Sequence, residues 1–142
     1  MKAKHILQSK GADVFAVSPD DTIAAAVGVL NDKNIGAVIV QDSRGEAVGI
    51  LSERDIVRRL GEKGAEAINM RVSDCMTGDP YTCAPDETID DLMGRMTEKR
   101  IRHLPVQSDG RIIGVISIGD VVKRKIQEAE QEAAALKEYI NS

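Results

Sequence analysis

The sequence predicts an α/β (α+β) fold in which one β-α-β-β-α unit occurs twice and a longer helix follows the second unit. The first observation is a seven-residue motif, Gly49-Ile-Leu-Ser-Glu-Arg-Asp55, that recurs as Gly114-Val-Ile-Ser-Ile-Gly-Asp120. Each copy places an apolar strand, a turn and a carboxylate directly before an amphipathic helical pattern. The second observation is that Ser18-Pro-Asp-Asp-Thr-Ile23 recurs as Ala84-Pro-Asp-Glu-Thr-Ile89. A strand-to-helix turn that occurs twice predicts a site that is built twice.

Length and composition are those of a compact globular protein. The chain has 142 residues, 42% apolar and 30% charged, so it has room for one domain or for two small ones that complete each other's core. No apolar run approaches the roughly 18 residues of a membrane span, and the start of the chain lacks an apolar core of signal-peptide length. We therefore expect a cytoplasmic protein without a membrane partner. A net charge of −4, with one phenylalanine, two tyrosines and no tryptophan, argues against nucleic acid as a partner.

Few residues of this chain could perform metal or nucleophilic chemistry. Cys75 and Cys83 form neither a Cys-x-x-Cys pair nor a disulfide framework. We interpret both as reduced residues that line the core, with a zinc or redox role as the alternative. No Walker loop, Ser-His-Asp set or metal-ligand cluster is visible, and His5 and His103 are the only histidines. The sequence therefore predicts a protein that is not an enzyme and requires no metal.

Changes of hydrophobic period define the elements of the first repeat. Apolar residues from Ile23 to Leu30 recur at the spacing of one helical face, and Pro19 to Thr22 supply a helix start before them. A turn at Asp42 to Gly45 separates two β-rich runs, which predicts a hairpin. In chain order the predicted strand, helix, hairpin strands and closing helix span Phe15–Val17, Ile23–Leu30, Ala37–Gln41, Ala47–Ser52 and Asp55–Leu60.

The second repeat is predicted to contain the same elements. They span Tyr81–Cys83, Thr88–Lys99, Leu104–Val106 and Ile112–Ser117, followed by the final helix. Gly61 to Arg71 is predicted as a linker, Val72 to Met76 as a short helix leading into the second repeat, and Lys4 to Lys10 as its counterpart for the first. We place repeat 1 at residues 1–66, repeat 2 at 67–126 and a C-terminal helical extension at 127–142. Because a unit of about 60 residues is marginal alone, we expect the repeats to pack sheet to sheet.

The last helix extends beyond its counterpart in the first repeat. Its apolar residues alternate spacings of four and three, which is the pattern of a seam that packs on another helix. They are Val122, Ile126, Ala129, Ala133, Leu136 and Ile140. The two alanines make the seam weak. Packing back onto its own domain is the alternative, and the sequence does not choose between the two.

The repeated motifs resemble those of the CBS domain, which occurs as a tandem pair called a Bateman module. The motifs that carry the resemblance are Ser-Pro-Asp-Asp-Thr-Ile, Gly-Ile-Leu-Ser-Glu-Arg-Asp-Ile, Lys-Arg-Ile-Arg-His-Leu-Pro-Val and Gly-Val-Ile-Ser-Ile-Gly-Asp-Val-Val. The chain is most similar to small stand-alone bacterial CBS-pair proteins, with plant relatives, that have no catalytic domain. The resemblance implies binding of AMP, ADP, ATP, NAD(H) or S-adenosylmethionine in the cleft between the repeats, and a homodimer of two pairs packed as a disc.

The Ser-x-x-Asp sequence at each strand-to-helix turn is suited to a ribose on chemical grounds. A carboxylate there can accept a hydrogen bond from each hydroxyl of a ribose 2′,3′-diol, each worth roughly 1.5 to 3 kcal/mol. We assign Asp55 and Asp120 as ribose ligands, and the Ser52 and Ser117 hydroxyls as contacts to sugar or phosphate oxygens. The helix N-terminus favours anions as well. The alternative is that each aspartate only caps its helix, worth about 1 kcal/mol; its presence in both repeats favours the ligand role.

The two repeats differ just before the first hairpin strand. Repeat 1 has Gly36-Ala37, which allow close backbone approach to an adenine ring, whereas repeat 2 has Arg102-His103, which offer cations. By the resemblance, such residues reach the phosphates of the nucleotide whose ribose is bound by the other repeat. This pairs Arg102 and His103 with Asp55 and places Ile35 to Ala37 around the base. For His103 the alternative is a surface or core-edge histidine.

Three further residues complete the candidate set. Ser18 and Ile23 are expected to contribute to the Asp120 nucleotide, and Arg54 lies in the turn beside Asp55. The full ligand-binding set is Ser18, Ile23, Ile35, Gly36, Ala37, Ser52, Arg54, Asp55, Arg102, His103, Ser117 and Asp120.

The sequence as a whole predicts a non-catalytic regulatory module. It is expected to bind an adenine nucleotide (AMP, ADP, ATP or NAD(H)) as an energy or redox sensor, to act as a homodimer and to signal to an unidentified regulated protein. Two alternatives stay open. One is a structural dimerisation module with vestigial sites, and the other is a regulator that binds S-adenosylmethionine.

Overall fold

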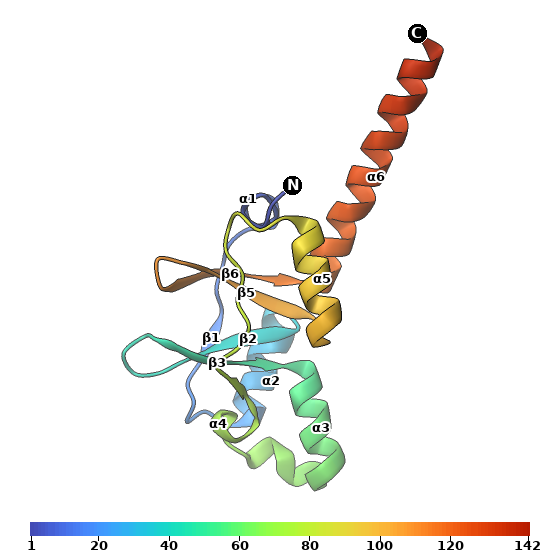
Figure 1. Ribbon diagram of the computed structural model, residues 1–142. Coiled ribbons are helices and arrows are strands. Elements are labelled where there is room, and N and C mark those ends of the chain that lie inside the picture. The colour runs from blue at the N-terminus through green and yellow to red at the C-terminus, as the bar shows by residue number, and fades with distance from the viewer. The chain divides into compact units, whose positions relative to one another are not determined.

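The computed structural model describes all residues from 1 to 142, which form two compact units (Figure 1). Unit 1 contains Met1–Ala12, Thr82–Ser108 and Gly114–Ser142, and unit 2 contains Asp13–Tyr81 and Asp109–Ile113. The first residues of the chain thus belong to the same unit as most of the second repeat. Each unit has its own hydrophobic core.

Unit 2 is built on a four-stranded sheet in the order β1-β2-β3-β4. Its strands are β1 (Ala16–Val17), β2 (Ala37–Gln41), β3 (Ala47–Ser52) and β4 (Thr77–Gly78), and its helices are α2 (Ile23–Lys33), α3 (Glu53–Lys63), the 3-10 helix η1 (Gly64–Asn69) and α4 (Val72–Cys75). β1 runs parallel to β2, and the other neighbours are antiparallel. The predicted hairpin is confirmed, with Ala37 opposite Ser52.

The core of unit 2 is formed by the sheet and the helices α2, α3 and α4. Because strand side chains alternate between faces, Val38 and Val40 of β2 and Leu51 of β3 belong to this core. The whole cluster is Val17, Ile23, Ala26, Leu30, Val38, Val40, Leu51, Ile56, Val72 and Cys75. Burying a side chain of this size contributes about 1.5–3 kcal/mol, so the cluster holds the start of α3 firmly against the sheet.

Unit 1 combines a two-stranded sheet with three helices. The strands are β5 (His103–Ser108) and β6 (Arg111–Ser117), and the helices are α1 (Ala3–Lys10), α5 (Ile89–Lys99) and α6 (Ile118–Asn141). α6 contacts both α5 and α1 (Figure 1). The core cluster is Ala3, Ile6, Leu7, Cys83, Ile89, Leu92, Met96, Leu104, Val106, Ile116 and Val121.

The short helices α1 and α4 occupy matching places in the two units. The N–H of Ala3 donates to the carbonyl of Glu87 at 2.9 Å, and the N–H of Val72 donates to that of Asp21 at 2.8 Å. Glu87 and Asp21 match one another in the repeats. The helix that precedes each repeat in the chain therefore packs in the unit built on the other repeat, and α1 ends in the unit that contains Asp120.

Two predicted elements differ from the structure. Tyr81–Cys83 is not a strand, because only Cys83 bridges to Val106. The carbonyl of Thr82 accepts a hydrogen bond from the Arg95 guanidinium, and the N–H of Ala84 donates to Glu87. Neither backbone group therefore bonds to a neighbouring strand. The predicted linker from Gly61 is largely helical, since α3 continues to Lys63 and η1 follows it. α3 stops at Gly64, whose φ of 65° suits a glycine.

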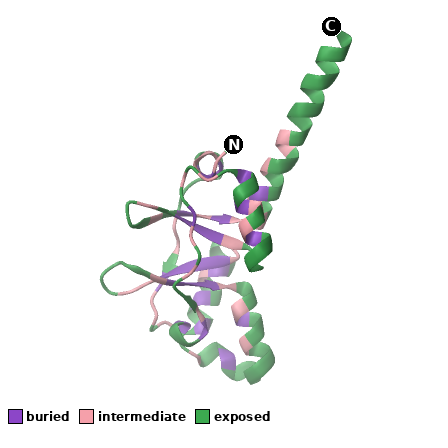
Figure 2. Cartoon of the chain, in the orientation of Figure 1, coloured by how far each residue is buried: buried purple, intermediate pink, exposed green.

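Helix α6 is partly buried near its start and exposed along its outer part (Figure 2). Val121 is fully buried, whereas every residue from Ala129 onward is exposed. Val122 and Ile126 of the predicted seam are also exposed, so the seam does not pack back onto its own unit. None of the helices has both the length and the apolar character that crossing a membrane requires.

Candidate functional site

Ser52 and Asp55 form a reciprocal capping box at the start of α3. The N–H of Asp55 donates to Ser52 Oγ at 3.3 Å, and the N–H of Ser52 donates to Asp55 Oδ2 at 2.9 Å. The Ser52 hydroxyl lies 3.1 Å from the same Oδ2. These contacts satisfy helix N–H groups that would otherwise lack partners. The serine is thus the N-cap and the aspartate the third helical residue, so a structural role for Asp55 is present, while its ribose role stays a prediction.

Ser117 and Asp120 form the same box at the start of α6. The N–H of Asp120 donates to Ser117 Oγ at 3.1 Å, and the N–H of Ser117 donates to Asp120 Oδ2 at 2.9 Å. One contact has no equivalent in the first repeat. The Lys10 ammonium donates to Asp120 Oδ2 at 2.7 Å and to the carbonyl of Val115 at 2.9 Å. The side chains of Lys10 and Asp120 are 38% and 24% exposed, so the ion pair is partly screened by water.

The different lengths of α1 and α4 explain why only the second repeat has this lysine. In unit 1, α1 continues to Lys10, whose ammonium reaches Val115 of β6. In unit 2, α4 already ends at Cys75, and the chain then forms β4, in which Thr77 pairs with Ile50 of β3. Ile50 matches Val115 in the repeats. A strand in unit 2 therefore occupies the place that the lysine has in unit 1.

The carboxyl group of Asp120 is ionised at neutral pH. Partial burial raises its pKa, but the hydrogen bond from Lys10, the bonds from Ser117 and the charge of Lys10 together outweigh burial, so the pKa of Asp120 lies below its usual value. Sequence reasoning missed Lys10 because it lies far from Asp120 in the chain. The one sequence feature that could have pointed to Lys10 was its position at the end of the predicted N-terminal helix.

Backbone hydrogen bonds tie the predicted contact residues to the two boxes. The N–H of Glu53 donates to the carbonyl of Gly36 at 2.9 Å, and the N–H of Ile118 donates to that of Arg102 at 2.8 Å. The structure thus brings Gly36 and Ala37 to the box of Asp55. It likewise brings Arg102, which is exposed, and His103, which is half-buried, to the helix start that carries Asp120. Their pairing with the ligand of the other repeat stays a prediction.

The other candidate residues have unequal freedom to meet a ligand. The side chain of Ile23 is fully buried in the core of unit 2, and its N–H donates to the carbonyl of Met70. Ser18 is half-buried, and its N–H donates to Asp21. Ile35 packs against the core, whereas Arg54 is exposed beside Asp55. Of these four, Arg54 is the charged side chain best able to reach a phosphate.

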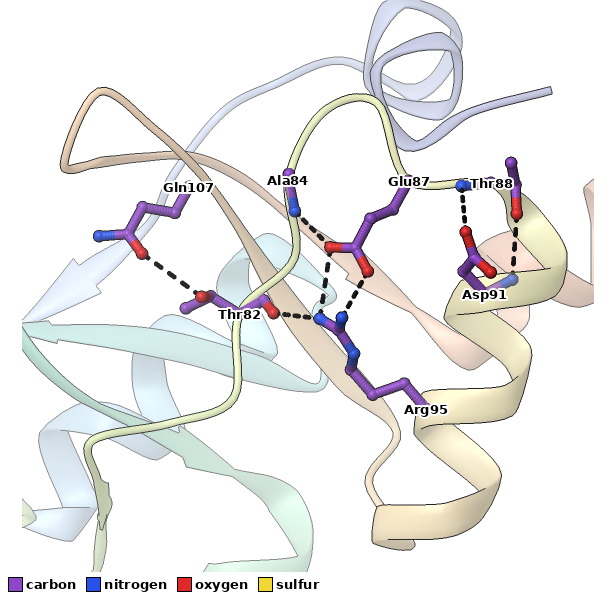
Figure 3. A network of polar contacts seen from close by, with 7 residues as sticks. All are labelled: Thr82, Ala84, Glu87, Thr88, Asp91, Arg95 and Gln107. Atoms are coloured by element: carbon purple, nitrogen blue, oxygen red, sulfur yellow. Dashed lines mark hydrogen bonds and ion pairs between the residues drawn. The ribbon is translucent and has the colours of Figure 1, made fainter.

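A second polar network lies in unit 1, around Arg95 (Figure 3). The guanidinium donates to the carbonyl of Thr82 and to both carboxylate oxygens of Glu87. Glu87 also accepts the N–H of Ala84 at 2.6 Å. Repeat 1 has Val29 where repeat 2 has Arg95. Because these groups satisfy one another, we interpret the network as a clamp on the loop before α5.

A third capping box begins α5 and resembles the other two in geometry (Figure 3). The N–H of Asp91 donates to Thr88 Oγ1 at 3.2 Å, and the N–H of Thr88 donates to Asp91 Oδ2 at 3.3 Å. It does not follow a hairpin strand and carries no candidate ligand residue. It is therefore a natural comparison for the boxes of Asp55 and Asp120.

The cysteines are core residues, as predicted. Both thiols are free, with Cys83 in the core of unit 1 and Cys75 in that of unit 2. Burial raises the pKa of both thiols, that of Cys83 to about 12. No group of three or more His, Cys, Asp or Glu side chains is arranged to hold a metal ion.

Comparison with known proteins identifies the family of both repeats. The family model described as "CBS domain" matches residues 4–62 and 72–126. The chain is 35% identical over 143 residues to the mitochondrial CBS domain-containing protein CBSX3 of Arabidopsis thaliana, covering 95% of this chain and 69% of that protein.

Solved structures show the same fold. The CBS-domain containing protein ATU1752 from Agrobacterium tumefaciens has a TM-score of 0.85 at 44% identity, over 87% of this chain and 92% of that chain. The CBS domain pair of protein MJ0100 was solved in complex with 5′-methylthioadenosine and S-adenosyl-L-methionine. It has a TM-score of 0.80 at 23% identity, over 90% of this chain and 98% of that one, a likeness that concerns the fold alone.

Proposed function

Because the chain belongs to the CBS domain family and carries two CBS domains in tandem, we propose that it is a regulatory module whose Asp55 and Asp120 bind the ribose of an adenosine-containing ligand. The observation that carries this proposal is the doubled capping box. In both boxes the capping contacts go to Oδ2 of the aspartate, so Oδ1 lies outside them. Each box therefore holds a carboxylate in a fixed orientation while one of its oxygens takes no part in the cap.

A fixed carboxylate at a helix start suits a vicinal diol for two reasons. The serine contacts restrain the aspartate before the ligand arrives, so less side-chain entropy is lost on binding. The two hydroxyls of the diol can donate to one carboxylate, and hydrogen bonds to a charged acceptor are worth roughly 1.5–3 kcal/mol each. The ring of adenine then needs only backbone donors and acceptors, which the Gly36-Ala37 segment supports.

We further propose that the ligand is an adenine nucleotide such as AMP, ADP, ATP or NAD(H). Both ligands of the MJ0100 structure contain adenosine, which supports the general class. Arg54 and Arg102 are exposed cations at the two helix starts, and these attract phosphates but repel the sulfonium of S-adenosylmethionine. Charge thus favours a nucleotide over S-adenosylmethionine, and no metal is needed in this proposal.

As a non-catalytic module, the protein would act as a homodimer and pass ligand occupancy to a regulated partner. A cytoplasmic location stays a prediction, since the Arabidopsis relative is named as mitochondrial. The alternative of a structural dimerisation module with vestigial sites predicts the same fold without ligand binding. Binding therefore separates the two.

Thermal unfolding with a panel of ligands tests the proposal. A ligand at 100 times its Kd that binds only the folded state adds about 2.7 kcal/mol, which corresponds to an increase in Tm of roughly 5–10 °C for a chain of this size. We expect this for AMP, ADP, ATP or NAD(H), but not for GMP or for 2′,3′-dideoxyadenosine monophosphate, which lacks the diol. Equal shifts with and without the diol would contradict the ribose assignment. Chromatography of the nucleotides afterwards should show no new product.

A further inference from the structure

The outer part of α6 exposes a continuous apolar seam that no other part of the chain covers. The four large residues of the seam are between 41% and 71% exposed, and the two alanines between them are exposed as well (Figure 2). The seam consists of Val122, Ile126, Ala129, Ala133, Leu136 and Ile140. A helix that is exposed at every residue along its outer half lacks the packing that usually stabilises helices in proteins.

α6 packs against its own unit through a face of the helix that differs from the seam. Val121 is buried in the core of unit 1, and the Glu128 carboxylate forms an ion pair with the N-terminal amine of Met1 at 3.2 Å. At about 100° per residue, the seam lies roughly a third of a turn away from this face. The seam is therefore free to bind a second partner while α6 stays attached to its own unit.

The identity of the seam residues favours a two-stranded parallel coiled coil. Spacings of four and three place Ile126, Ala133 and Ile140 at a positions and Val122, Ala129 and Leu136 at d positions. Isoleucine at two of the three a positions and leucine at one d position match the combination that favours two parallel strands. The small alanines in the middle let the two helices approach closely, and larger residues pack at both ends.

The charges beside the seam choose between the two possible directions. In a parallel pair, each g residue faces the e residue of the next heptad in the partner, so Lys125 meets Glu130 and Glu132 meets Lys137. Both contacts join opposite charges. In a fully overlapping antiparallel pair, Glu130 and Glu132 would each meet their own copy, and Lys123 would meet Lys137. Like charges would then face one another along the seam.

We propose that the seam is an interface between two copies of this chain, formed by their α6 helices as a parallel, in-register coiled coil. This inference rests on the homodimer of the proposed function for the identity of the partner, and it does not depend on ligand binding. Lys125 already pairs with Asp90 of its own chain at 2.9 Å, in an exposed contact. The dimer would add Glu130 of the second copy to this lysine.

Cross-linking of an Ile140→Cys variant tests the proposal. In the parallel register the two introduced thiols are adjacent, whereas in the antiparallel one they are separated by roughly 27 Å. The native cysteines are buried and do not compete. We expect most of the protein to form a disulfide dimer under mild oxidation at micromolar concentration. Adding Leu136→Asp should reduce the yield at least tenfold, whereas Ala135→Asp, on the other side of the helix, should leave it unchanged.

A charge exchange tests the direction independently. Lys125→Glu in the same background should lower the yield, and Glu130→Lys added to it should restore the yield. Absence of cross-linking, or equal cross-linking with Leu136→Asp, would overturn the proposal. In parallel, sedimentation measures the oligomeric state of the unoxidised variants, and thermal unfolding measures the Tm shift that AMP causes in them. A dimer or an AMP shift that persists without cross-linking would show that this interface alone is wrong and that the proposed function stands.

Discussion

Lys10 makes the two candidate aspartates chemically different, although the repeats match closely around them. Its ammonium is 2.7 Å from Asp120, and the first repeat has a strand where this lysine would lie. A ribose that binds Asp120 must share the carboxylate with Lys10 or displace it. Asp55 has no lysine that competes with the ribose, so we expect the ligand to occupy the Asp55 site first.

Replacing Lys10 by methionine should therefore strengthen the second site. Partly exposed ion pairs are worth about 0.2–1 kcal/mol, so adenosine should bind Asp120 roughly 1.4- to fivefold more tightly. Calorimetry in an Asp55→Asn background isolates this site. Lys4→Met removes a comparable exposed pair, with Asp86, from the same helix and should change nothing. Weaker binding in Lys10→Met would mean that Lys10 contacts the ligand instead of competing with it.

Arg102 should discriminate between ligands with and without phosphate. Its side chain is exposed, while its carbonyl is fixed by Ile118. We expect Arg102→Ala to weaken AMP severalfold and to leave adenosine almost unchanged. The loss should shrink in high salt, because exposed charges are screened over about 8 Å at physiological ionic strength. Titration of both ligands at two salt concentrations makes the comparison. An equal loss for AMP and adenosine would indicate that Arg102 supports the strand.

At the scale of elements, two glycines allow a neighbouring segment to approach each hairpin closely, β4 at Gly49 and α1 at Gly114. A Cβ on Gly49 would lie 2.7 Å from the carbonyl oxygen of Thr77, and one on Gly114 would lie 2.6 Å from a methyl group of Leu7. A backbone carbonyl cannot move aside without breaking β4, whereas a leucine side chain can rotate. The same motif position is thus under different constraints in the two units.

Gly49→Ala should destabilise the protein more than Gly114→Ala. Overpacking costs about 1–3 kcal/mol, and we expect Gly49→Ala at the upper end of this range. Gly28→Ala provides the control, because it lies in α2 with open space around it and should stabilise the fold by roughly 0.5–1 kcal/mol. Urea unfolding of the three variants measures the differences. A smaller loss for Gly49→Ala than for Gly114→Ala would contradict this account.

The sequence predicted elements best where the determinants are local. β2 and β3 have the predicted bounds, because alternation and the turn between them specify a hairpin. The strand predicted at Tyr81–Cys83 was wrong, because only Cys83 pairs with the sheet. The carbonyl of Thr82 accepts a hydrogen bond from Arg95 and the N–H of the following Ala84 donates to Glu87, and these side-chain contacts lie outside the local hydrophobic pattern. The closing helix of the first repeat extends beyond its predicted end at Leu60, because Gly61 is tolerated within α3, which continues to Lys63 and is capped by Gly64.

At the scale of the whole molecule, the sequence predicted those parts of the candidate site that occur in both repeats. Duplication pointed to both Ser-x-x-Asp boxes, and the structure gives them the same geometry. Lys10 was not predictable, because its contact with Asp120 depends on α1 packing in the unit of the other repeat. Such a long-range exchange leaves no pattern in a window of neighbouring residues.

Burial of Cys83 should make the stability of the protein fall at alkaline pH. The pKa of this thiol is raised to about 12 from 9.0. Between these values the unfolded chain loses the proton and the folded chain keeps it, so stability is complete below about pH 9 and declines above it, by at most roughly 1.4 kcal/mol per pH unit. Urea unfolding at pH 8 and pH 10 should show a smaller decline for Cys83→Ala than for the parent. Identical slopes would argue against a protonated thiol.

Calorimetric titration of AMP against four aspartate variants tests the central claim most directly. Asparagine keeps an acceptor for the serine N–H but loses the charge, so Asp55→Asn, Asp120→Asn and their combination should fold. Asp91→Asn makes the same change in the capping box of α5 and serves as the matched control. We expect each single variant to lose one class of site, weakened about 10- to 150-fold from a loss of 1.5–3 kcal/mol, and Asp91→Asn to bind like the parent. If the double variant bound AMP as tightly as the parent, the two aspartates would not be the ribose ligands.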